Sequence, residues 1–393
     1  MRPHSRRAQE LQTRPAMTLT IGIHTDGIPV ISRHRGSLTV ENALMGVGFH
    51  WQRRYPLRLK TERYALADGN YGIWLICETG LEDYLRSVVS SEMNPEAPEE
   101  FIKAHAIIAR SWALRQVGAR KPDGKEEKHR PCRPTIPAHE SKEIIRIFDG
   151  SDHSGFDLCN DDHCQRFQGE DAVTPRAEKA VKETEGLVLL DRHGKIADAR
   201  YSKCCGGRTE LFSTCWQDRN HDYLQSVNDP WCDLSRLPEE ERQRILKSVM
   251  KDYDRTTTPN FLRWQRFVDA SGIADRLSRD FHINIGSITN LRPIASGPSG
   301  RISRLEIQGT DGTTVIGKEL AIRRLLADDC LLSSAFTAEK AEGGFLLHGR
   351  GWGHGVGLCQ IGAAAMAAAG HSAEEILSHY YPGTRLSHFE SAS

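Results

Sequence analysis

The stretch EDYLRSVVSSEMNPEAPEEFIKAHAIIARSWAL, from Glu82 to Leu114, decides the fold of the central part of the chain. Apolar residues at helical spacing predict a first helix over 81–93, and Asn94-Pro95-Glu96-Ala97-Pro98 then interrupts the pattern. Pro98 suits the first turn of a second helix, which we expect over about 99–117. The stretch therefore predicts a helical hairpin with Glu92 where the first helix ends.

Two basic residues follow Glu92 on the second helix. Lys103 and Arg110 are spaced so that they share one helix face, and a hairpin can present both cations to Glu92. A lone carboxylate among basic groups suits a general acid/base or a sugar-binding group. The alternative is an ordinary surface ion pair.

The segments on both sides of the hairpin predict a mixed α+β fold. Short strands are indicated before it over 19–24, 28–32, 37–40, 57–60 and 73–78. After it we expect an exposed loop over 118–142, a helix over 176–185 and strands over 187–190 and 198–202. The predicted parts are a disordered leader (1–18), a β-rich subdomain (19–77), a catalytic core carrying the hairpin (78–215), a helical insertion (216–290) and a strand-rich C-terminal part that completes a cleft (291–388).

The composition limits the classes of function. The 393 residues include 52 Lys and Arg and 52 Asp and Glu, and this balance argues against a nucleic-acid partner. An apolar share of 38% allows a sizeable core. The basic start is not followed by the apolar segment of a signal peptide, and no stretch approaches the about 20 apolar residues of a membrane span. We therefore expect no membrane span and find no export signal.

A metal site is predicted by DHSGFDLCNDDHCQRFQG, residues 152–169. His153, Cys159, His163 and Cys164 supply two imidazoles and two thiols, enough for tetrahedral zinc. Because no coordination position is left open, the zinc would be structural. The alternative is a Cys159–Cys164 disulfide beside two uninvolved histidines.

Two further motifs carry unusual residues. In YSKCCGGRTELFSTCWQD, residues 201–218, the vicinal Cys204 and Cys205 pair with another cysteine or remain buried thiols. In HGRGWGHGVGLCQIGAAAMAAAGHSAEEILSHYYPGT, residues 348–384, five glycines around His354 expose backbone amides to a ligand. This second motif continues into a helix of small residues, which suits close packing.

The order of these motifs resembles the stage II sporulation protein D family, which includes amidase-enhancer domains. The resemblance rests on SSEM…K…ARSWAL, HCQ, a GG turn and GWGHGVGLCQIGAAAMAAAG…ILSHYYPGT, within residues 78–385. It implies a peptidoglycan lytic transglycosylase with Glu92 as its single acid/base, and His153, Cys159, His163 and Cys164 as a zinc loop. The implied substrate-binding residues are Lys103, Arg110, Tyr201, Glu210, His354, Gln360 and Tyr380.

The resemblance also raises expectations about substrate, partner and location. The substrate would be peptidoglycan glycan strands without stem peptides, cut at the MurNAc–GlcNAc linkage to leave 1,6-anhydro ends. The alternatives are a noncatalytic glycan-binding enhancer of a cell-wall amidase, and a hydrolase that leaves reducing ends. Cys204, Cys205 and Cys359 stand where the family usually has Ser or Thr. The substrate implies an extracytoplasmic or periplasmic location, with which the missing signal peptide conflicts.

Overall fold

The computed structural model describes most of the chain outside the first residues and several internal segments. The described residues are 17–45, 53–61, 63–69, 72–120, 143–148, 153, 155–161, 164–251, 261–329 and 331–389. The predicted leader before residue 17 and the predicted loop after residue 120 lie outside these ranges.

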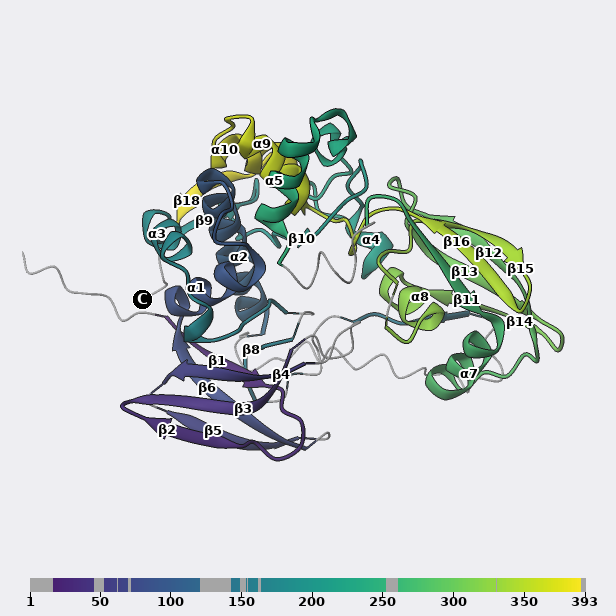
Figure 1. Ribbon diagram of the computed structural model, residues 1–393, viewed down its shortest axis with the longest axis horizontal. Helices are drawn as coiled ribbons and strands as arrows, with labels where there is room; N and C mark the ends of the chain where they lie inside the picture. Colours follow the sequence, from purple (N-terminus) through teal and green to yellow (C-terminus); the bar gives the residue numbers. More distant parts are fainter. Residues whose placement is uncertain are drawn as a thin grey trace, which may run out of the picture.

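Two small sheets form the N-terminal part, drawn in purple and blue in Figure 1. One has the strand order β2-β3-β4, and the other has the order β5-β6-β1-β8. The strands are β1 (Thr18–Ile23), β2 (Ile31–His34), β3 (Ser37–Met45), β4 (Arg53–Lys60), β5 (Tyr64–Gly69), β6 (Gly72–Gly80) and β8 (Leu158–Cys159). Each predicted strand overlaps one of these, whereas β5 and the two-residue β8 had no predicted counterpart.

The predicted hairpin is present as α1 (Leu81–Glu92) and α2 (Glu99–Arg120). The predicted apolar stripe of α2 is buried, including Phe101 and Trp112. However, α2 is buried on nearly all sides, because it packs against several elements at once. These elements are α1, α3 (Pro175–Glu183), β9 (Leu187–Leu190), α9 (Gln360–Ala368) and α10 (Ala373–Tyr380).

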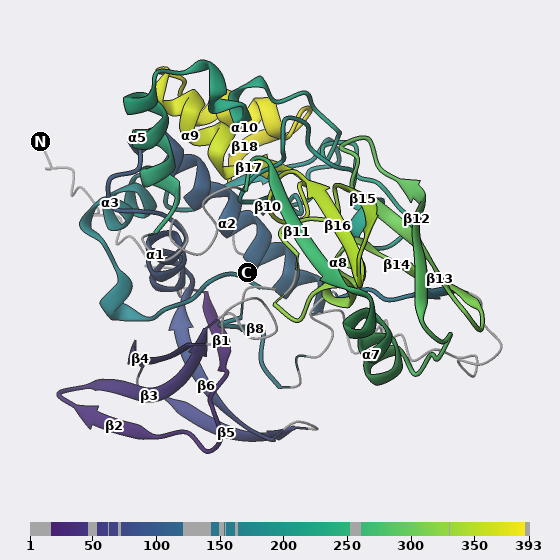
Figure 2. The same cartoon turned by 45° about the vertical axis from the view of Figure 1, so that its right-hand side comes forward.

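A second lobe lies on the right of Figure 1 and is turned forward in Figure 2. Its sheets have the orders β11-β16-β15 and β12-β13-β14-β7. Its elements are β7 (Glu143–Ile145), β11 (Trp264–Asp269), α7 (Ala270–Phe281), β12 (Ile288–Ser296), β13 (Ile302–Gly309), β14 (Thr313–Gly317), α8 (Glu319–Leu326), β15 (Phe336–Ala341) and β16 (Gly344–Gly349). The segment predicted as a helical insertion holds α5 (Glu239–Val249) and α7, but strand β11 lies between them. It forms by pairing with β16, which is distant in sequence, so the local pattern did not reveal it.

The described part of the chain has two large hydrophobic cores, one in the body formed by the N-terminal sheets and the helical hairpin, and one in the second lobe. The first runs from β1 through the helical hairpin to α10, and the second fills the lobe between its sheets, α7 and α8. Two short parallel strands, β10 (Tyr201–Ser202) and β17 (Leu358–Cys359), pair within the first body, as do β9 and β18 (Arg385–His388). The predicted mixed α+β class is confirmed. Among the described residues no helix has both the length and the hydrophobicity of a membrane span.

Candidate active site

Glu92 is the last residue of α1, and its partly buried carboxylate receives hydrogen bonds from three distant segments. The backbone N–H of Arg166 donates to Oε1 at 3.3 Å, and the Tyr201 hydroxyl donates to the same oxygen at 3.5 Å. The Gln360 amide donates to Oε2 at 3.4 Å. All three bonds are longer than the usual range of about 2.7 to 3.2 Å. The structure therefore brings Glu92, Tyr201 and Gln360 together.

The pairing of β10 with β17 explains why Tyr201 and Gln360 meet at Glu92. Tyr201 is opposite Leu358 in this parallel pair, so Gln360 follows two residues after the paired position. Cys359 caps the next helix, α9, by accepting from the Gly362 N–H at 3.4 Å. Gln360 consequently begins a helix whose start is fixed beside Tyr201.

His105 of α2 is a fourth neighbour, which the sequence did not indicate. Its side chain is fully buried, and its ring packs edge-on against Tyr201 with centroids 4.7 Å apart. The Gln360 amide lies 3.5 Å from His105 Nε2. Burial lowers the pKa of His105 to about 4, so the imidazole is neutral near pH 7 and accepts from the amide. Gln360 can thus donate to Glu92 and His105 at once.

The charges around Glu92 come from residues that the helical spacing did not suggest. Burial acts to raise the pKa of the Glu92 carboxyl, but the positive charges of Arg166 and Lys203 act together against it. The net result is a pKa below the ordinary value of 4.5. Arg166 adjoins the HCQ motif and Lys203 lies in YSKCC, so the clue to both was their place within the chemical motifs.

Lys103 and Arg110 do not reach Glu92. The Lys103 ammonium lies 3.0 to 3.2 Å from the carboxylates of Glu99, Glu100 and Glu183. Arg110 is fully buried and forms a bidentate pair with Glu82 at 2.7 and 2.9 Å. The hairpin presents these cations to other acids because α2 is enclosed by neighbours on the face that carries Arg110. Arg110 has no exposed surface for a glycan contact.

Glu210 is also engaged inside the protein. Its buried carboxylate accepts from the Leu211 N–H, the Thr214 hydroxyl, and both the N–H and the hydroxyl of Ser299. These bonds join the segment after β10 to the second lobe. The structure does not bring Glu210 to Glu92.

The glycine-rich loop around His354 encloses an internal arginine. Arg301 donates to the Gly353 carbonyl at 2.9 Å, and a Cβ on Gly355 would lie only 2.5 Å from the Arg301 guanidinium carbon. His354 accepts from the Val356 N–H and packs edge-on against Trp216. The close approach that the glycines predicted is thus made to Arg301.

Tyr380 is buried on α10 and points to a different group. Its hydroxyl donates to Asp229 Oδ2 at 3.0 Å rather than to Glu92. Asp229 lies beside Cys205 and Cys232, in a cluster that the sequence did not bring together.

The predicted zinc loop brings together every one of its ligands that the structure describes. The ligand atoms of His153, Cys159 and Cys164 lie within 4.8 Å of one another, and Cys164 Sγ is 3.6 Å from His153 Nε2. Cys159 and Cys164 are thiols rather than a disulfide. The fourth predicted ligand, His163, lies outside the described residues. Two thiols and an imidazole at this separation fit zinc.

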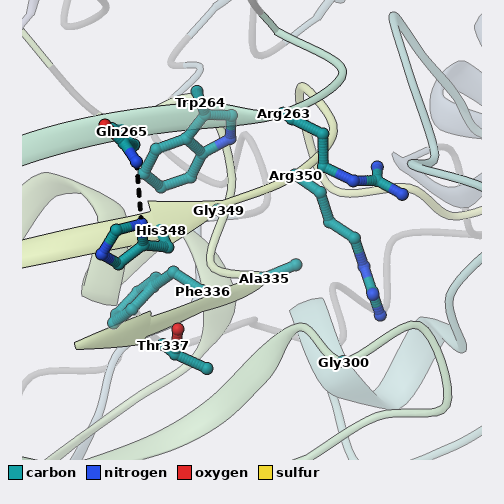
Figure 3. Close-up of a pocket in the computed structure, with 10 residues that line it drawn as sticks. All are labelled: Arg263, Trp264, Gln265, Gly300, Ala335, Phe336, Thr337, His348, Gly349 and Arg350. Atoms are coloured by element: carbon teal, nitrogen blue, oxygen red, sulfur yellow. Dashed lines mark hydrogen bonds between the residues drawn. The ribbon is translucent and has the colours of Figure 1, made fainter. Parts of the chain in front are cut away.

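A cavity of about 740 Å³ lies in the second lobe (Figure 3). Trp264, Phe336 and His348 form one part of its lining, and the side chains of Arg263 and Arg350 extend together on another. None of its lining residues is a hydrogen-bond partner of Glu92, so this cavity is separate from the groups around the carboxylate.

Comparisons with known proteins cover both bodies. Residues 70–190, which include Glu92 and the predicted zinc loop, match the family described as stage II sporulation protein. Residues 210–357 match a family described as a domain of unknown function (DUF8618).

The curated relatives extend the similarity over most of the chain. Stage II sporulation protein D of Bacillus amyloliquefaciens is 26% identical over 318 residues, 79% of this chain and 75% of that protein. An uncharacterized protein of Brachyspira hyodysenteriae is 23% identical over 312 residues, 79% of this chain and 68% of that protein. The amidase enhancer of Bacillus subtilis is 23% identical over 330 residues, 78% of this chain but 40% of that protein.

Proposed function

Because the chain belongs to the family of stage II sporulation protein D and the amidase enhancers, we propose that it is a peptidoglycan lytic transglycosylase. The substrate is the glycan strand, cut at the MurNAc–GlcNAc linkage without water. The strand is denuded of stem peptides, and the product carries a 1,6-anhydro-MurNAc end.

The observation that carries this proposal is the set of partners around Glu92. Within the described ranges its hydrogen-bond partners are a backbone N–H, a phenol and a carboxamide, and the charged groups that chiefly shift its pKa are Arg166 and Lys203, so no second carboxylate is among either set. Most glycosidases that use water place two carboxylic groups about 5 to 9.5 Å apart. A transglycosylase needs one, since a hydroxyl of the substrate replaces the nucleophile.

In the first step the Glu92 carboxyl gives its proton to the glycosidic oxygen, and the bond from that oxygen to the anomeric carbon of MurNAc breaks. The Glu92 carboxylate then takes the proton of the C6 hydroxyl as that oxygen bonds to the anomeric carbon. Glu92 ends protonated, and no water is consumed. Tyr201 and Gln360 donate to the carboxylate in its charged state and hold its two oxygens in position.

For Glu92 to act as an acid near neutral pH, substrate binding must raise the pKa of its carboxyl. Arg166 and Lys203 hold the pKa of Glu92 below its ordinary value, so the free protein carries a carboxylate at neutral pH. A bound glycan would exclude water from this partly buried group and favour its protonated form. The acid step therefore depends on substrate binding or on an acidic medium.

The zinc loop has a structural part in the proposal. His153, Cys159 and Cys164, with His163 as the fourth ligand, would hold one zinc ion. This ion would fix the conformation of the loop that leads to Arg166. The ion would take no part in proton transfer, which stays with Glu92.

A second candidate is a glycan-binding protein that stimulates a cell-wall amidase without cutting. Two observations favour it: a relative is named amidase enhancer, and the lowered pKa of Glu92 suits a carboxylate that accepts hydrogen bonds from sugar hydroxyls. In this case Glu92 binds the glycan but transfers no proton.

Mass spectrometry of digested, denuded glycan strands tests the proposal. We expect fragments with anhydro ends, lighter by one water than the hydrolytic product. Reducing ends would instead indicate a hydrolase, and strands left intact at high protein concentration would indicate the enhancer.

Replacing the carboxyl identifies its role. Glu92→Gln should abolish cleavage and leave glycan binding, because the amide keeps the size of the side chain but has no acidic proton. Glu96→Gln is the matched control, since Glu96 is an exposed carboxylate just beyond the same helix end, and it should cleave normally. Cleavage by Glu92→Gln at the rate of the control would refute the assignment.

A further inference from the structure

Five buried side chains form what we term the thiol cluster: Cys204, Cys205, Asp229, Cys232 and Cys359. They come from three segments that are distant in sequence. The first directly follows β10, the second is the short 3-10 helix Pro230–Cys232 with its preceding Asp229, and the third is the junction of β17 with α9.

The distances within the thiol cluster suit a single ion. The ligand atoms of Cys205, Asp229, Cys232 and Cys359 all lie within 4.8 Å of one another. Cys205 Sγ is 3.2 Å from Asp229 Oδ2, and Cys204 Sγ is 3.4 Å from Cys232 Sγ. Tetrahedral zinc, with bonds of about 2.3 Å to sulfur, holds its ligand sulfurs about 3.8 Å apart. Small side-chain adjustments would therefore place an ion among these groups.

The buried charge of Asp229 also favours a bound cation. This carboxylate is fully buried, and no ion pair within the described part of the chain involves it. It accepts from the Tyr380 hydroxyl at 3.0 Å, the Cys205 thiol, and the Cys232 N–H at 3.2 Å. A buried carboxylate without a cationic partner is unfavourable, because neutral donors replace only part of its hydration. A divalent cation among the thiols would supply the missing positive charge.

We propose that the thiol cluster is a second metal site, which binds one zinc ion through the thiolates of Cys205, Cys232 and Cys359 and the carboxylate of Asp229. Binding releases the three thiol protons to solvent. Four protein ligands leave no coordination position open, so this site is structural. Cys204 supports it from beside Cys232 without being one of the four ligands.

The second metal would fix the surroundings of Glu92. Cys359 directly precedes Gln360, and the strand that holds Cys359 pairs with the strand that holds Tyr201. An ion bound to Cys359 and Cys232 would join this strand pair to the 3-10 helix. The site would therefore set the positions of both side chains that donate to Glu92.

Elemental analysis of the purified full-length protein tests the proposal, with Cys359→Ser as the main variant. Serine is a favourable helix N-cap, so it can replace Cys359 as acceptor for the Gly362 N–H while offering no thiolate. Cys215→Ser is the matched control, since Cys215 is a buried thiol outside both metal-ligand groups. To count this site alone, all variants are also made on the Cys159→Ser, Cys164→Ser background, which removes the loop ligands.

On that background we expect one zinc per chain, retained in Cys215→Ser and lost in Cys359→Ser. Cobalt loading of otherwise unaltered protein gives a second measurement that does not depend on the background variant folding. A thiolate-to-cobalt charge-transfer band should weaken in Cys359→Ser and stay unchanged in Cys215→Ser.

Two results would overturn the proposal. One is a zinc content and a cobalt spectrum that Cys359→Ser leaves unchanged in protein whose circular dichroism is native. The other is a Cys204–Cys232 disulfide found by mass spectrometry of the alkylated, unreduced protein in place of a bound ion. Neither result depends on glycan cleavage, so failure here is distinct from failure of the proposed enzymatic function.

Discussion

At the scale of single residues, the main property of Glu92 is that its cations lie outside its own helical hairpin. Arg166 and Lys203 approach it from later segments, whereas Lys103 and Arg110 pair with acids elsewhere. The effect on the carboxyl is the one that nearby positive charge always has: the ionised form is favoured. A general acid in this position is limited by how much of it is protonated.

Lys203→Met should move the pH dependence of glycan cleavage. Removing this positive charge raises the pKa of Glu92, so a larger fraction of the carboxyl is protonated at any given pH. If Glu92 is the acid, kcat/KM falls as pH rises through its pKa, and this decline should shift to higher pH in the variant. The pH profiles of kcat/KM for the two proteins provide the measurement.

The control is Lys195→Met, which removes an exposed lysine that is not among the charges shifting the pKa of Glu92. Its profile should match that of the unaltered protein. A profile that stays in place in Lys203→Met, with normal folding, would contradict the role of Glu92 as the acid.

At the scale of elements, α2 shows what helical periodicity can and cannot predict. The extent of the helix and its apolar stripe follow from local spacing, and both agree with the structure. The neighbours of α2 are not encoded locally, so periodicity does not reveal that Arg110 is enclosed between α1, α3 and β9. The result is a buried ion pair with Glu82, whose side chain is 25% exposed.

Glu82→Gln should lower the free energy of unfolding by about 3 kcal/mol, because it leaves the Arg110 charge buried with only carbonyl partners. Urea denaturation monitored by circular dichroism measures the change. Lys179→Met removes an exposed lysine of α3 that pairs with Glu99 of α2, and it should leave stability almost unchanged because the pair is fully solvated. Equal effects of the two substitutions would show that the buried pair has no special weight.

Local spacing does not encode which distant segments pack together, and this explains which parts of the site the sequence could predict. Glu92 and the zinc-loop residues were predicted because they lie in local motifs with distinctive spacing. Strand β9 was predicted with its observed bounds, but the two-residue strands β8 and β17 exist only through pairing with distant partners. Tyr201 and Gln360, the neighbours of His105, come from the β10–β17 pair, so the helical pattern of α2 could not show that His105 lies beside the site. Lys203 lies in a motif that the sequence singled out, but its approach to Glu92 depends on the same pair.

At the scale of the whole molecule, the predicted zinc loop contacts both the N-terminal sheet, through β8 and β1, and Glu92, through the Arg166 N–H. Strand β8 pairs in parallel with β1, and Asp157 accepts from the N–H and hydroxyl of Thr20. Phe156 packs so closely over Gly22 that a Cβ there would lie 2.6 Å from its ring. An ion on Cys159 and Cys164 would therefore stabilise the sheet as well as the loop.

Cys164→Ser should reduce bound zinc by one ion per chain and speed amide hydrogen exchange in β1. The reason is that the loop holding β8 against β1 would lose one of its ligands. Exchange in α2 should change little, because its packing does not involve the loop ion. Elemental analysis and hydrogen-exchange mass spectrometry give the two measurements.

Cys77→Ser is the matched control, since Cys77 is a buried thiol on β6, the other strand paired with β1. It should keep its zinc and leave exchange slow in β1. If Cys164→Ser loses zinc but exchanges no faster than the control, the ion does not stabilise the sheet.

The hydrogen bond between Glu92 and Gln360 spans 268 positions of the chain. During synthesis on the ribosome Glu92 emerges long before the residue that completes its surroundings. A nascent or prematurely terminated chain therefore holds the carboxylate without Gln360 and without the strand pair that positions Tyr201. If Glu92 is the acid/base, as proposed, glycan cleavage requires that the final segments have first folded back onto the hairpin.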